Sequence, residues 1–351
     1  MKYPYEWNLA DGYIMPRNGY KVFSTFACGG GSTMGYKLAG FEMLGICEID
    51  PQMARIYKQN HKPKMIYLED IRVFRKREDL PVELFNLDIL DGSPPCSSFS
   101  TAGNREKDWG KEKQFREGQA KQRLDDLFFE YIALVKRLQP KVAVAENVSG
   151  LLKGAAKGYV KEIQAAFKEA GYDLQVFLFN AASMGVPQKR QRSFFIARRS
   201  DLKLQPLKCN FDDKPITFGQ VRKEGDGQYK QPTPYDHNIW KHYRVTDRTY
   251  ADTNMRLKNK PSCFNAIFVT DDDVCNTICS ASGSKMTLPQ QKRFMSIREI
   301  KCCGTFPQDY DFMDVDPKYV IGMSVPPVMT ARIAEQIQWQ WLDKLEANNA
   351  G

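Results

Sequence analysis

The feature that most constrains this chain is a regular alternation of apolar runs and helical patterns over its first 200 residues. Short runs rich in β-branched and aromatic residues are typical of buried strands, and segments with apolar residues at helical spacing separate them. This alternation predicts an α/β fold with a doubly wound, mostly parallel sheet and helices on both faces. The expected strands are Lys21–Phe26, Met43–Ile49, Lys64–Leu68, Leu84–Leu90, Lys141–Ala145, Leu174–Phe179 and Phe194–Ala197. The expected helices are Met34–Ala39, one beginning at Asp50-Pro51, Leu124–Leu138 and Val160–Ala170.

The alternation stops near residue 201, which predicts a change of domain. Residues 201–290 are rich in Asp, Lys, Asn, Pro and Gly, and therefore predict a smaller, loop-rich domain. A regular pattern returns at the end of the chain, where apolar residues recur every four positions and predict one stripe of a terminal helix. The stripe consists of Met329, Ile333, Ile337, Trp341 and Leu345. We therefore expect three segments, 1–200, 201–290 and 291–351, the last completing the first domain.

Composition narrows the class of protein and of partner. Lys and Arg number 51 against 42 Asp and Glu, and the net charge of +9 favours an acidic partner such as nucleic acid. No apolar run is long enough for a membrane span, and the first residues lack the apolar core of a secretory signal. The nine cysteines are odd in number and contain no CxxC, so a disulfide framework and a zinc site are poor interpretations. Reduced thiols in a cytoplasmic protein are the expectation.

Two loops that follow predicted strands are candidates for binding and chemistry. A glycine cluster from Phe26 to Gly35 precedes a helix, and Glu48 ends the next strand about 20 residues later, where a carboxylate suits ribose hydroxyls. This pair fits a nicotinamide cofactor, a flavin or S-adenosylmethionine, or else a tight turn followed by a helix cap. Cys96 follows another strand after two prolines, at the edge where α/β sheets bind ligands. The alternative for Cys96 is a small buried core residue.

Charged residues mark two further positions. Glu146 ends an otherwise apolar strand, where a half-buried carboxyl group could serve as an acid, or else as a helix cap or ion-pair partner. Arg190 and Arg192 lie two residues apart, so on an extended chain they face the same way and could hold a phosphate or a carbonyl oxygen. A solvated charge run is the alternative for the arginines.

Taken in order, these segments resemble the motifs of the DNA (cytosine-5) methyltransferase family, of the bacterial or phage restriction–modification type. The match spans about residues 21–338. The matching segments are Phe26-Ala-Cys28-Gly29-Gly30 for FxGxG, Pro95-Cys96 for PC, Glu146-Asn147-Val148 for ENV, Gln188-Lys189-Arg190-Gln191-Arg192 for QxRxR, Arg293–Glu299 with Phe306-Pro307 for RxxSxRE…FP, and Gly322–Val325 for GNSV. Two positions depart from the pattern, because Cys28 replaces the first glycine and Met323 replaces the Asn of GNSV.

The resemblance implies a Rossmann-like methyltransferase fold that uses S-adenosylmethionine. It makes 1–200 the catalytic and cofactor-binding domain and 201–290 the target recognition domain. Cys96 is then the nucleophile that attacks C6 of cytosine, a protonated Glu146 serves N3, Arg192 holds O2, and Arg190 orients the catalytic loop or a phosphate. The implied cofactor residues are Phe26, Gly30, Glu48, Ile49, Asp70, Pro95, Leu127 and Ser324.

The implied substrate is double-stranded DNA, from which the target base must be flipped. The polar segment Asn104–Arg123 then serves as a closing loop, with a solvated linker as the alternative. Recognition residues are expected within 201–290, and Thr277-Ile278 resembles the segment that contacts the target-strand backbone. The candidate contacts are Trp240, Lys241, Tyr243, Arg244, Arg248 and Arg256. The chain's size suggests a bacterial or phage restriction–modification setting. We further expect a cytoplasmic, nucleoid-associated monomer with no membrane partner, and a cognate restriction endonuclease that acts separately.

Three alternatives remain open. An RNA cytosine-5 methyltransferase of the same fold is disfavoured because the only Cys-Phe, Cys263-Phe264, is followed by Asn265 instead of the Thr of the tRNA-modifying branch. A DNA-binding regulatory homologue without activity is disfavoured by the intact motif residues, and a dinucleotide oxidoreductase does not explain the motif order. For Met323, we expect a Ser324 that stays in place but is held less firmly than after Asn, unless Met323 packs into an apolar pocket.

Overall fold

The computed structural model describes residues 2–95, 112–113, 122–123, 126–152, 157–223, 225, 227–281 and 283–350. The chain forms two compact units. The large-sheet unit contains Tyr13–Asn180, Gln191–Asn210 and Thr330–Gly351, and the small-sheet unit contains Met1–Gly12, Ala181–Arg190 and Phe211–Met329. These limits differ from the three expected segments, because residues 291–329 lie in the small-sheet unit and only the last 22 residues join the large sheet.

Seven strands form the sheet of the large-sheet unit. In spatial order they are β3 (Met65–Leu68), β2 (Glu42–Glu48), β1 (Lys21–Thr25), β4 (Ile89–Gly92), β7 (Val142–Val148), β10 (Gln191–Arg199) and β8 (Tyr172–Asn180). The first five strands pair in parallel, which confirms the mostly parallel sheet, whereas β10 is antiparallel to both β7 and β8. A parallel return after β8 would need a crossover of a dozen or more residues, and only residues 181–190 connect β8 to β10.

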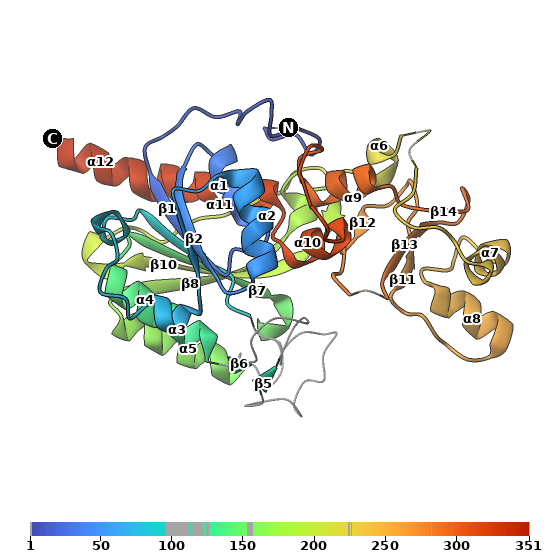
Figure 1. Cartoon of the computed structure of the whole chain (residues 1–351), viewed down its shortest axis with the longest axis horizontal. Helices are drawn as coiled ribbons and strands as arrows, with labels where there is room; N and C mark the ends of the chain where they lie inside the picture. Colours follow the sequence, from blue (N-terminus) through green and yellow to red (C-terminus); the bar gives the residue numbers. More distant parts are fainter. Residues whose placement is uncertain are drawn as a thin grey trace. The chain divides into compact units, whose positions relative to one another are not determined.

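Helices cover both faces of this sheet (Figure 1). Helices α3, α4 and α5 lie against one face, where their apolar side chains form a continuous buried core with the sheet. Helices α1 and α2 and the C-terminal helix lie on the opposite face. The bounds are α1 (Gly31–Leu38), α2 (Pro51–His61), α3 (Ile71–Phe74), α4 (Leu127–Leu138) and α5 (Lys157–Glu169), with short helical turns at η1 (Val82–Phe85), η3 (Ser149–Leu152) and η6 (Ser200–Leu202) and a two-stranded pair β5 (Glu112–Lys113) and β6 (Gln122–Arg123). The predicted start of α2 is confirmed, since the Asp50 carboxylate accepts the backbone N–H groups of Gln52 and Met53.

The predicted strand Leu84–Leu90 is wrong except for its last two residues, Ile89 and Leu90. Pro81 precedes a 3-10 turn at η1 (Val82–Phe85), and β4 begins only at Ile89. Proline favours the start of a helical turn because its φ is already helical and its missing N–H is not needed there. The apolar composition of this run therefore reflects burial of Leu84 in the core and not an extended backbone.

The C-terminal helix carries the predicted apolar stripe. It consists of α11 (Pro327–Ile337), a π-helical turn at η7 (Gln338–Leu342) and α12 (Asp343–Ala350). A repeat of four residues exceeds the 3.6 residues of an α-helical turn, and the wider π turn absorbs part of that drift. Ile337 and Trp341 are consequently fully buried, and the Trp341 indole donates to the Gln205 carbonyl at 2.8 Å. None of the described helices is long and apolar enough to cross a membrane.

The small-sheet unit is built around an aromatic core. Trp240, Tyr250, Phe268 and Phe294 pack against one another beside a three-stranded sheet of β11, β13 and β14. Strands β9 and β12 form a separate parallel pair. The bounds are η5 (Ala181–Ser183), β9 (Gln188–Lys189), α6 (Phe218–Val221), α7 (Pro234–Lys241), α8 (Tyr250–Lys258), β11 (Ala266–Phe268), β12 (Cys275–Asn276), β13 (Lys285–Leu288), β14 (Arg293–Phe294), α9 (Ile297–Gly304) and α10 (Pro317–Met323).

Substitution of Trp341 tests how much the C-terminal helix stabilises the large-sheet unit. We expect Trp341→Ala to lower the free energy of unfolding by about 3–5 kcal/mol, because it leaves a large cavity and an unpaired carbonyl. Trp339→Ala is the matched control, since Trp339 is 48% exposed two residues earlier. Urea unfolding followed by far-ultraviolet circular dichroism measures both. Equal losses for the two variants would contradict the burial argument.

Candidate active site

The loop between β1 and α1 adopts a backbone that ordinary residues avoid. Phe26 (φ 54°), Cys28 (φ 47°) and Gly30 (φ 83°) all lie in the left-handed region. A Cβ atom at Gly30 would also approach Nε2 of His61 to 2.3 Å, so this position requires glycine for both reasons. Cys28, which departs from the family motif, therefore occupies a conformation that a glycine would adopt at lower cost.

Glu48 holds this loop from the end of β2. Its carboxylate is buried and accepts the backbone N–H of Cys28 at 2.8 Å and that of Asp50 at 2.9 Å. Burial raises the pKa of Glu48, while these backbone hydrogen bonds act in the opposite direction. The acidic side chain expected for a ribose thus lies at the expected strand end, in a fixed orientation beside the glycine loop.

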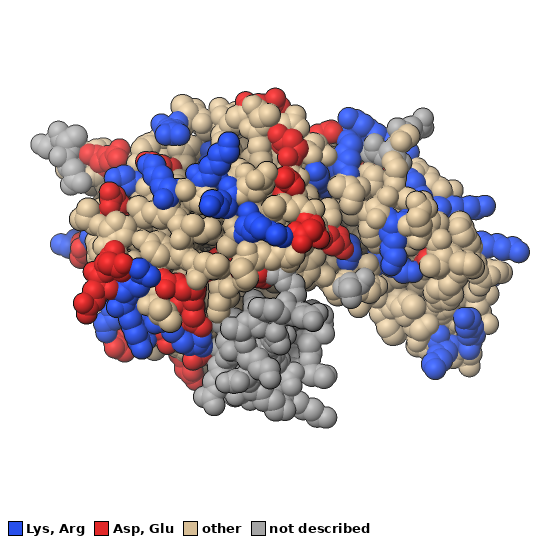
Figure 2. Space-filling model, viewed as in Figure 1, with Lys and Arg blue, Asp and Glu red and all other residues tan. Residues whose placement is uncertain are grey.

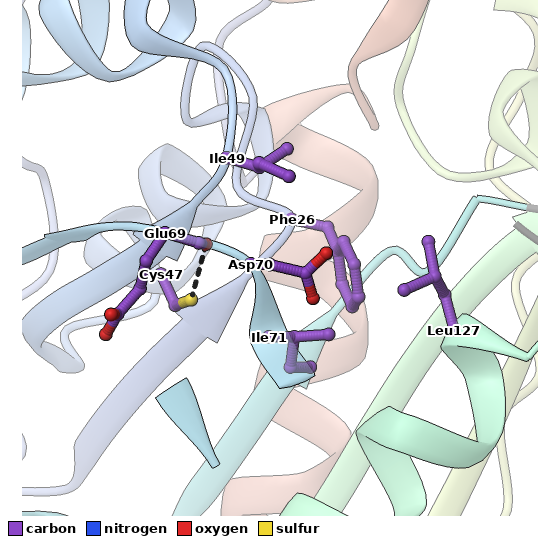
Figure 3. A pocket seen from close by; sticks show the side chains of 7 residues that line it. All are labelled: Phe26, Cys47, Ile49, Glu69, Asp70, Ile71 and Leu127. Carbon is purple, nitrogen blue, oxygen red and sulfur yellow. Dashed lines mark hydrogen bonds between the residues drawn. The ribbon is translucent and has the colours of Figure 1, made fainter. Parts of the chain in front are cut away.

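A small pocket opens beside the ends of β1, β2 and β3 (Figure 3). Four predicted cofactor residues line it, Phe26, Ile49, Asp70 and Leu127. Three further lining residues were missed by the sequence argument, although each is the chain neighbour of a predicted cofactor residue: Cys47, Glu69 and Ile71.

The pocket combines apolar walls with a fixed carboxylate. Phe26, Ile49 and Leu127 offer flat or branched apolar surface, which suits a planar aromatic ring (Figure 3). The Asp70 carboxylate accepts the backbone N–H of Arg72 at 2.7 Å as the N-cap of α3, so its position is set by the helix. These side chains are of the kinds that contact an aromatic ring and its amino group, and Glu48 lies at the adjacent strand end, outside the lining. Of the other predicted cofactor residues in this unit, Gly30 and Pro95 lie outside the lining.

A second cluster lies at the end of β7. Glu146 and Arg192 form an ion pair, with 2.8 Å between Oε1 and Nε, and their side chains are only 12% and 16% exposed. The pairing of β10 with β7 brings them together, because Phe194 is opposite Glu146 and Arg192 is opposite Val148. Two side chains predicted from separate motifs are therefore direct neighbours.

The same strand end is tied to the segment that leads to Cys96. The side-chain amide of Asn147 donates to the Pro94 carbonyl at 3.0 Å, and Ser193 donates to the Asn147 carbonyl at 3.1 Å. Neither contact was anticipated for these residues. Cys96 itself lies outside the described residues, as does most of the segment Asn104–Arg123 expected to close over the site.

Arg190 has a different environment from Arg192: the two side chains, expected to face the same way on an extended chain, contact different partners. The chain passes from one unit to the other between them. The Arg190 guanidinium is buried and donates to the backbone carbonyls of Ile278 (3.1 Å), Gly322 (2.8 Å) and Ser324 (2.9 Å). The Arg190 guanidinium therefore holds three backbone segments together and has no exposed face that could bind a phosphate.

Ser324 is held firmly, contrary to the expectation based on Met323. Its N–H donates to the Val320 carbonyl at 3.1 Å, its hydroxyl donates to the same carbonyl at 2.8 Å, and its own carbonyl accepts from Arg190. Met323 is 45% exposed, which also argues against its packing into an apolar pocket. The helix end itself therefore supplies what the missing Asn was expected to supply.

Several expected recognition residues turn out to be structural. Trp240 is buried in the aromatic core, Tyr243 packs on Phe268 with ring centroids 4.7 Å apart, and Arg256 pairs with Asp247. The remaining candidates lie at the surface of the small-sheet unit: Lys241, Arg244 and Arg248.

A broad groove runs over the small-sheet unit. Lys189, Arg248 and the acidic run 271–273 line it, and the Arg248 side chain is 80% exposed. Basic side chains spread over the visible surface around α7 and α8, with few acidic ones among them (Figure 2). Within the groove, Lys189 and Arg248 both pair with Asp273, and the lining carries four aspartates against these two cations. The basic surface around α7 and α8 is therefore the part of this unit that suits a polyanion better.

Comparisons with known proteins agree with this geometry. The family model of the C-5 cytosine-specific DNA methylase matches residues 20–339. The chain is 36% identical to the Type II methyltransferase M.NgoPII of Neisseria gonorrhoeae, over 92% of this chain and 96% of the relative. It is 32% identical to M.Sau96I of Staphylococcus aureus, over 91% and 75%.

Solved structures share the fold at low sequence identity. A DNMT2 from Spodoptera frugiperda superposes with a TM-score of 0.63 at 16% identity, over 91% of this chain and 99% of that one. The Dnmt2 methyltransferase of S. pombe gives 0.56 at 15% identity, over 92% and 99%. The mostly parallel sheet, the order of the motifs and a family match over nearly the whole length lead to one conclusion: this chain belongs to the C-5 cytosine-specific DNA methylases and is a DNA cytosine-5 methyltransferase.

Proposed function

We propose that the chain transfers a methyl group from S-adenosylmethionine to C5 of a flipped-out cytosine in a specific double-stranded DNA sequence. The reaction passes through a covalent bond between Cys96 and C6 of the base. The observation that carries this proposal is the Glu146–Arg192 ion pair, largely buried at a strand end that is hydrogen-bonded to Pro94, two residues before Cys96.

Glu146 and Arg192 match the polar edge of a cytosine. A protonated Glu146 donates to N3, and the Arg192 guanidinium donates to O2, so the two groups together withdraw electrons from the ring. Without a base, each side chain satisfies the other in the ion pair. Entry of the base replaces the ion pair by two hydrogen bonds to a neutral ring, so the Glu146 carboxylate takes up a proton from solvent as the base enters, and neither side chain is left without a partner.

Cys96 supplies the nucleophile. Its thiolate adds to C6, a C–S bond forms, and the electron pair of the C5–C6 double bond makes C5 nucleophilic. After methylation at C5, a base removes the C5 proton, the C–S bond breaks, and the thiolate leaves as the double bond returns. The side-chain amide of Asn147 supports this chemistry by holding the Pro94 carbonyl, and thereby the approach to Cys96.

The pocket at the ends of β1, β2 and β3 is the proposed cofactor site. When bound there, S-adenosylmethionine supplies an electrophilic methyl group. Phe26, Ile49 and Leu127 would enclose the adenine, Asp70 would accept from its amino group, and Glu48 would accept from the ribose. The remaining proposed contacts are Gly30 and Pro95, and Ser324 toward the amino-acid end.

Arg190 acts in this proposal as a positioning residue. Its three backbone carbonyl partners come from the segment before the late motif and from the Gly322–Ser324 turn. It would therefore hold Ser324 and Thr277-Ile278 in one arrangement without touching the base. This replaces the direct contact with a phosphate that the sequence suggested.

Residues 201–290 are the proposed target recognition region. The basic surface around α7 and α8 (Figure 2) is the best candidate for contact with DNA, because Lys241, Arg244 and Arg248 are exposed and a phosphate backbone is the complementary polyanion. Similarity to Type II methyltransferases supports a restriction–modification role with a separate endonuclease. We further propose a monomer that acts in the cytoplasm on nucleoid DNA.

Trapping with 5-fluorocytosine tests the covalent step. We expect wild-type protein to form a stable adduct with duplex DNA that carries the modified base, because fluorine at C5 cannot leave as a proton does. We expect the Cys96→Ser variant to form no adduct. Denaturing gel electrophoresis and peptide mass spectrometry measure the adduct in both proteins. An adduct of equal yield in Cys96→Ser would move the nucleophile elsewhere, and adducts with RNA alone would favour an RNA methyltransferase.

Glu146→Gln tests the proton donor. We expect the methylation rate at saturating substrates to fall about 10²–10⁴-fold, the usual contribution of a positioned acid. Cofactor affinity should stay unchanged, because Glu146 does not line the pocket. Glu130→Gln is the matched control, since Glu130 of α4 also forms a partly buried ion pair, with Arg75. Similar losses in both variants would point to general destabilisation and not to acid catalysis.

A further inference from the structure

A buried carboxylate next to the glycine loop has no part in the chemistry above. Asp91 lies in β4 and is 5% exposed. Its Oδ2 accepts from the Ser24 hydroxyl at 2.7 Å and from the Ser32 hydroxyl at 2.8 Å, and its Oδ1 accepts from the Tyr36 hydroxyl at 3.2 Å. Within the described part of the chain, it forms no ion pair with a Lys, Arg or His.

The two serines flank the glycine loop. Ser24 lies two residues before Phe26, and Ser32 lies two residues after Gly30. A single carboxylate oxygen therefore holds both ends of the loop together. The loop needs such a constraint, because Phe26 and Cys28 adopt left-handed backbone conformations that non-glycine residues avoid unless their surroundings impose them.

We propose that Asp91, in its ionised form, is a positioning residue for the cofactor: through Ser24 and Ser32 it clamps the glycine loop in the shape that receives S-adenosylmethionine. The inference rests on the proposed function. Glu48 holds the middle of the same loop through the Cys28 N–H, so two carboxylates from two strands would fix one binding element.

The charge of the Asp91 carboxylate is sensitive to pH near neutrality. Burial raises its pKa to about 6, against the three hydroxyl hydrogen bonds, and the charge of Glu146 acts in the same direction as burial. The other titratable groups that face it are the phenols of Tyr36, Tyr57 and Tyr131, and burial raises the pKa of each, so they stay neutral. A protonated Asp91 carries a hydrogen that needs an acceptor, so at least one hydroxyl must turn away.

A lower pH is therefore expected to have opposite effects on the stability of the folded chain and on cofactor binding. Because the pKa of Asp91 is raised in the folded chain, the folded state binds this proton more readily than the unfolded state does. The stability that protonation contributes is present at low pH and is lost as pH rises through about 6. Cofactor binding requires the ionised clamp, so it weakens as pH falls through the same range.

Isothermal titration of S-adenosylmethionine tests the clamp without any turnover. For wild-type protein we expect affinity to fall about tenfold between pH 7 and pH 5, in proportion to the ionised fraction of Asp91. Asp91→Asn should bind about tenfold more weakly at pH 7, show little change toward pH 5, and melt no lower than wild type, since the amide mimics the neutral acid.

Asp88→Asn is the matched control. Asp88 is buried three residues earlier in the chain, but it contacts the Lys21 N–H and the Lys141 ammonium instead of the loop. This variant should melt at a lower temperature and keep the wild-type pH profile of binding.

Wild-type affinity and pH profile in Asp91→Asn would overturn the inference. If Asp91→Asn does not fold, Ser32→Ala tests the inference instead. This variant removes one hydrogen bond of the clamp and leaves the Asp91 carboxylate in place. Weaker cofactor binding by folded Ser32→Ala supports the clamp, and unchanged binding overturns it. A wild-type chain that binds no cofactor at any pH would instead contradict the proposed function.

Discussion

The antiparallel pairing of β10 with β7 is the constraint on which the candidate active site depends. A parallel arrangement would place Arg192 at the opposite edge of the sheet from Glu146, since parallel and antiparallel neighbours end at opposite edges. The observed register instead sets the two side chains 2.8 Å apart at the carboxyl end of β7. The same edge receives β4, whose continuation to Pro94 is held by Asn147. One pairing choice thus joins three motifs that lie far apart in the sequence.

The proposed cofactor site in the large-sheet unit depends on the glycine loop, whose backbone conformation needs support from neighbouring side chains. The glycine loop holds two non-glycine residues in the left-handed region, at a cost of about 1–2 kcal/mol each. Glu48 and Asp91 stabilise it from β2 and β4, the one by accepting a backbone N–H and the other by accepting two hydroxyl groups. Because both carboxylates are buried, their hydrogen bonds act in a medium of low dielectric constant and are correspondingly strong.

Sequence patterns predicted the sheet and most helices, because these follow from local periodicity. The pocket residues Phe26, Ile49, Asp70 and Leu127 came from the family resemblance. Sequence patterns failed where tertiary contacts override local preference. Leu84 is apolar yet belongs to a turn, and Trp240 is aromatic yet belongs to a core and not to a DNA surface. Arg190 could not be separated from Arg192 by spacing alone, since the chain changes units between them.

Asp91 shows most clearly what sequence patterns cannot predict. An aspartate within a buried strand has no periodic signal, and its importance comes only from the convergence of Ser24, Ser32 and Tyr36 in space.

The most direct test of the central claim is base-resolution sequencing of 5-methylcytosine in DNA from bacterial cells that express the chain, with Cys96→Ser expressed in parallel. We expect 5-methylcytosine at one short sequence context with the wild type and none with the variant. Unmethylated DNA, or methyl groups on adenine or on cytosine N4 instead of C5, would contradict it.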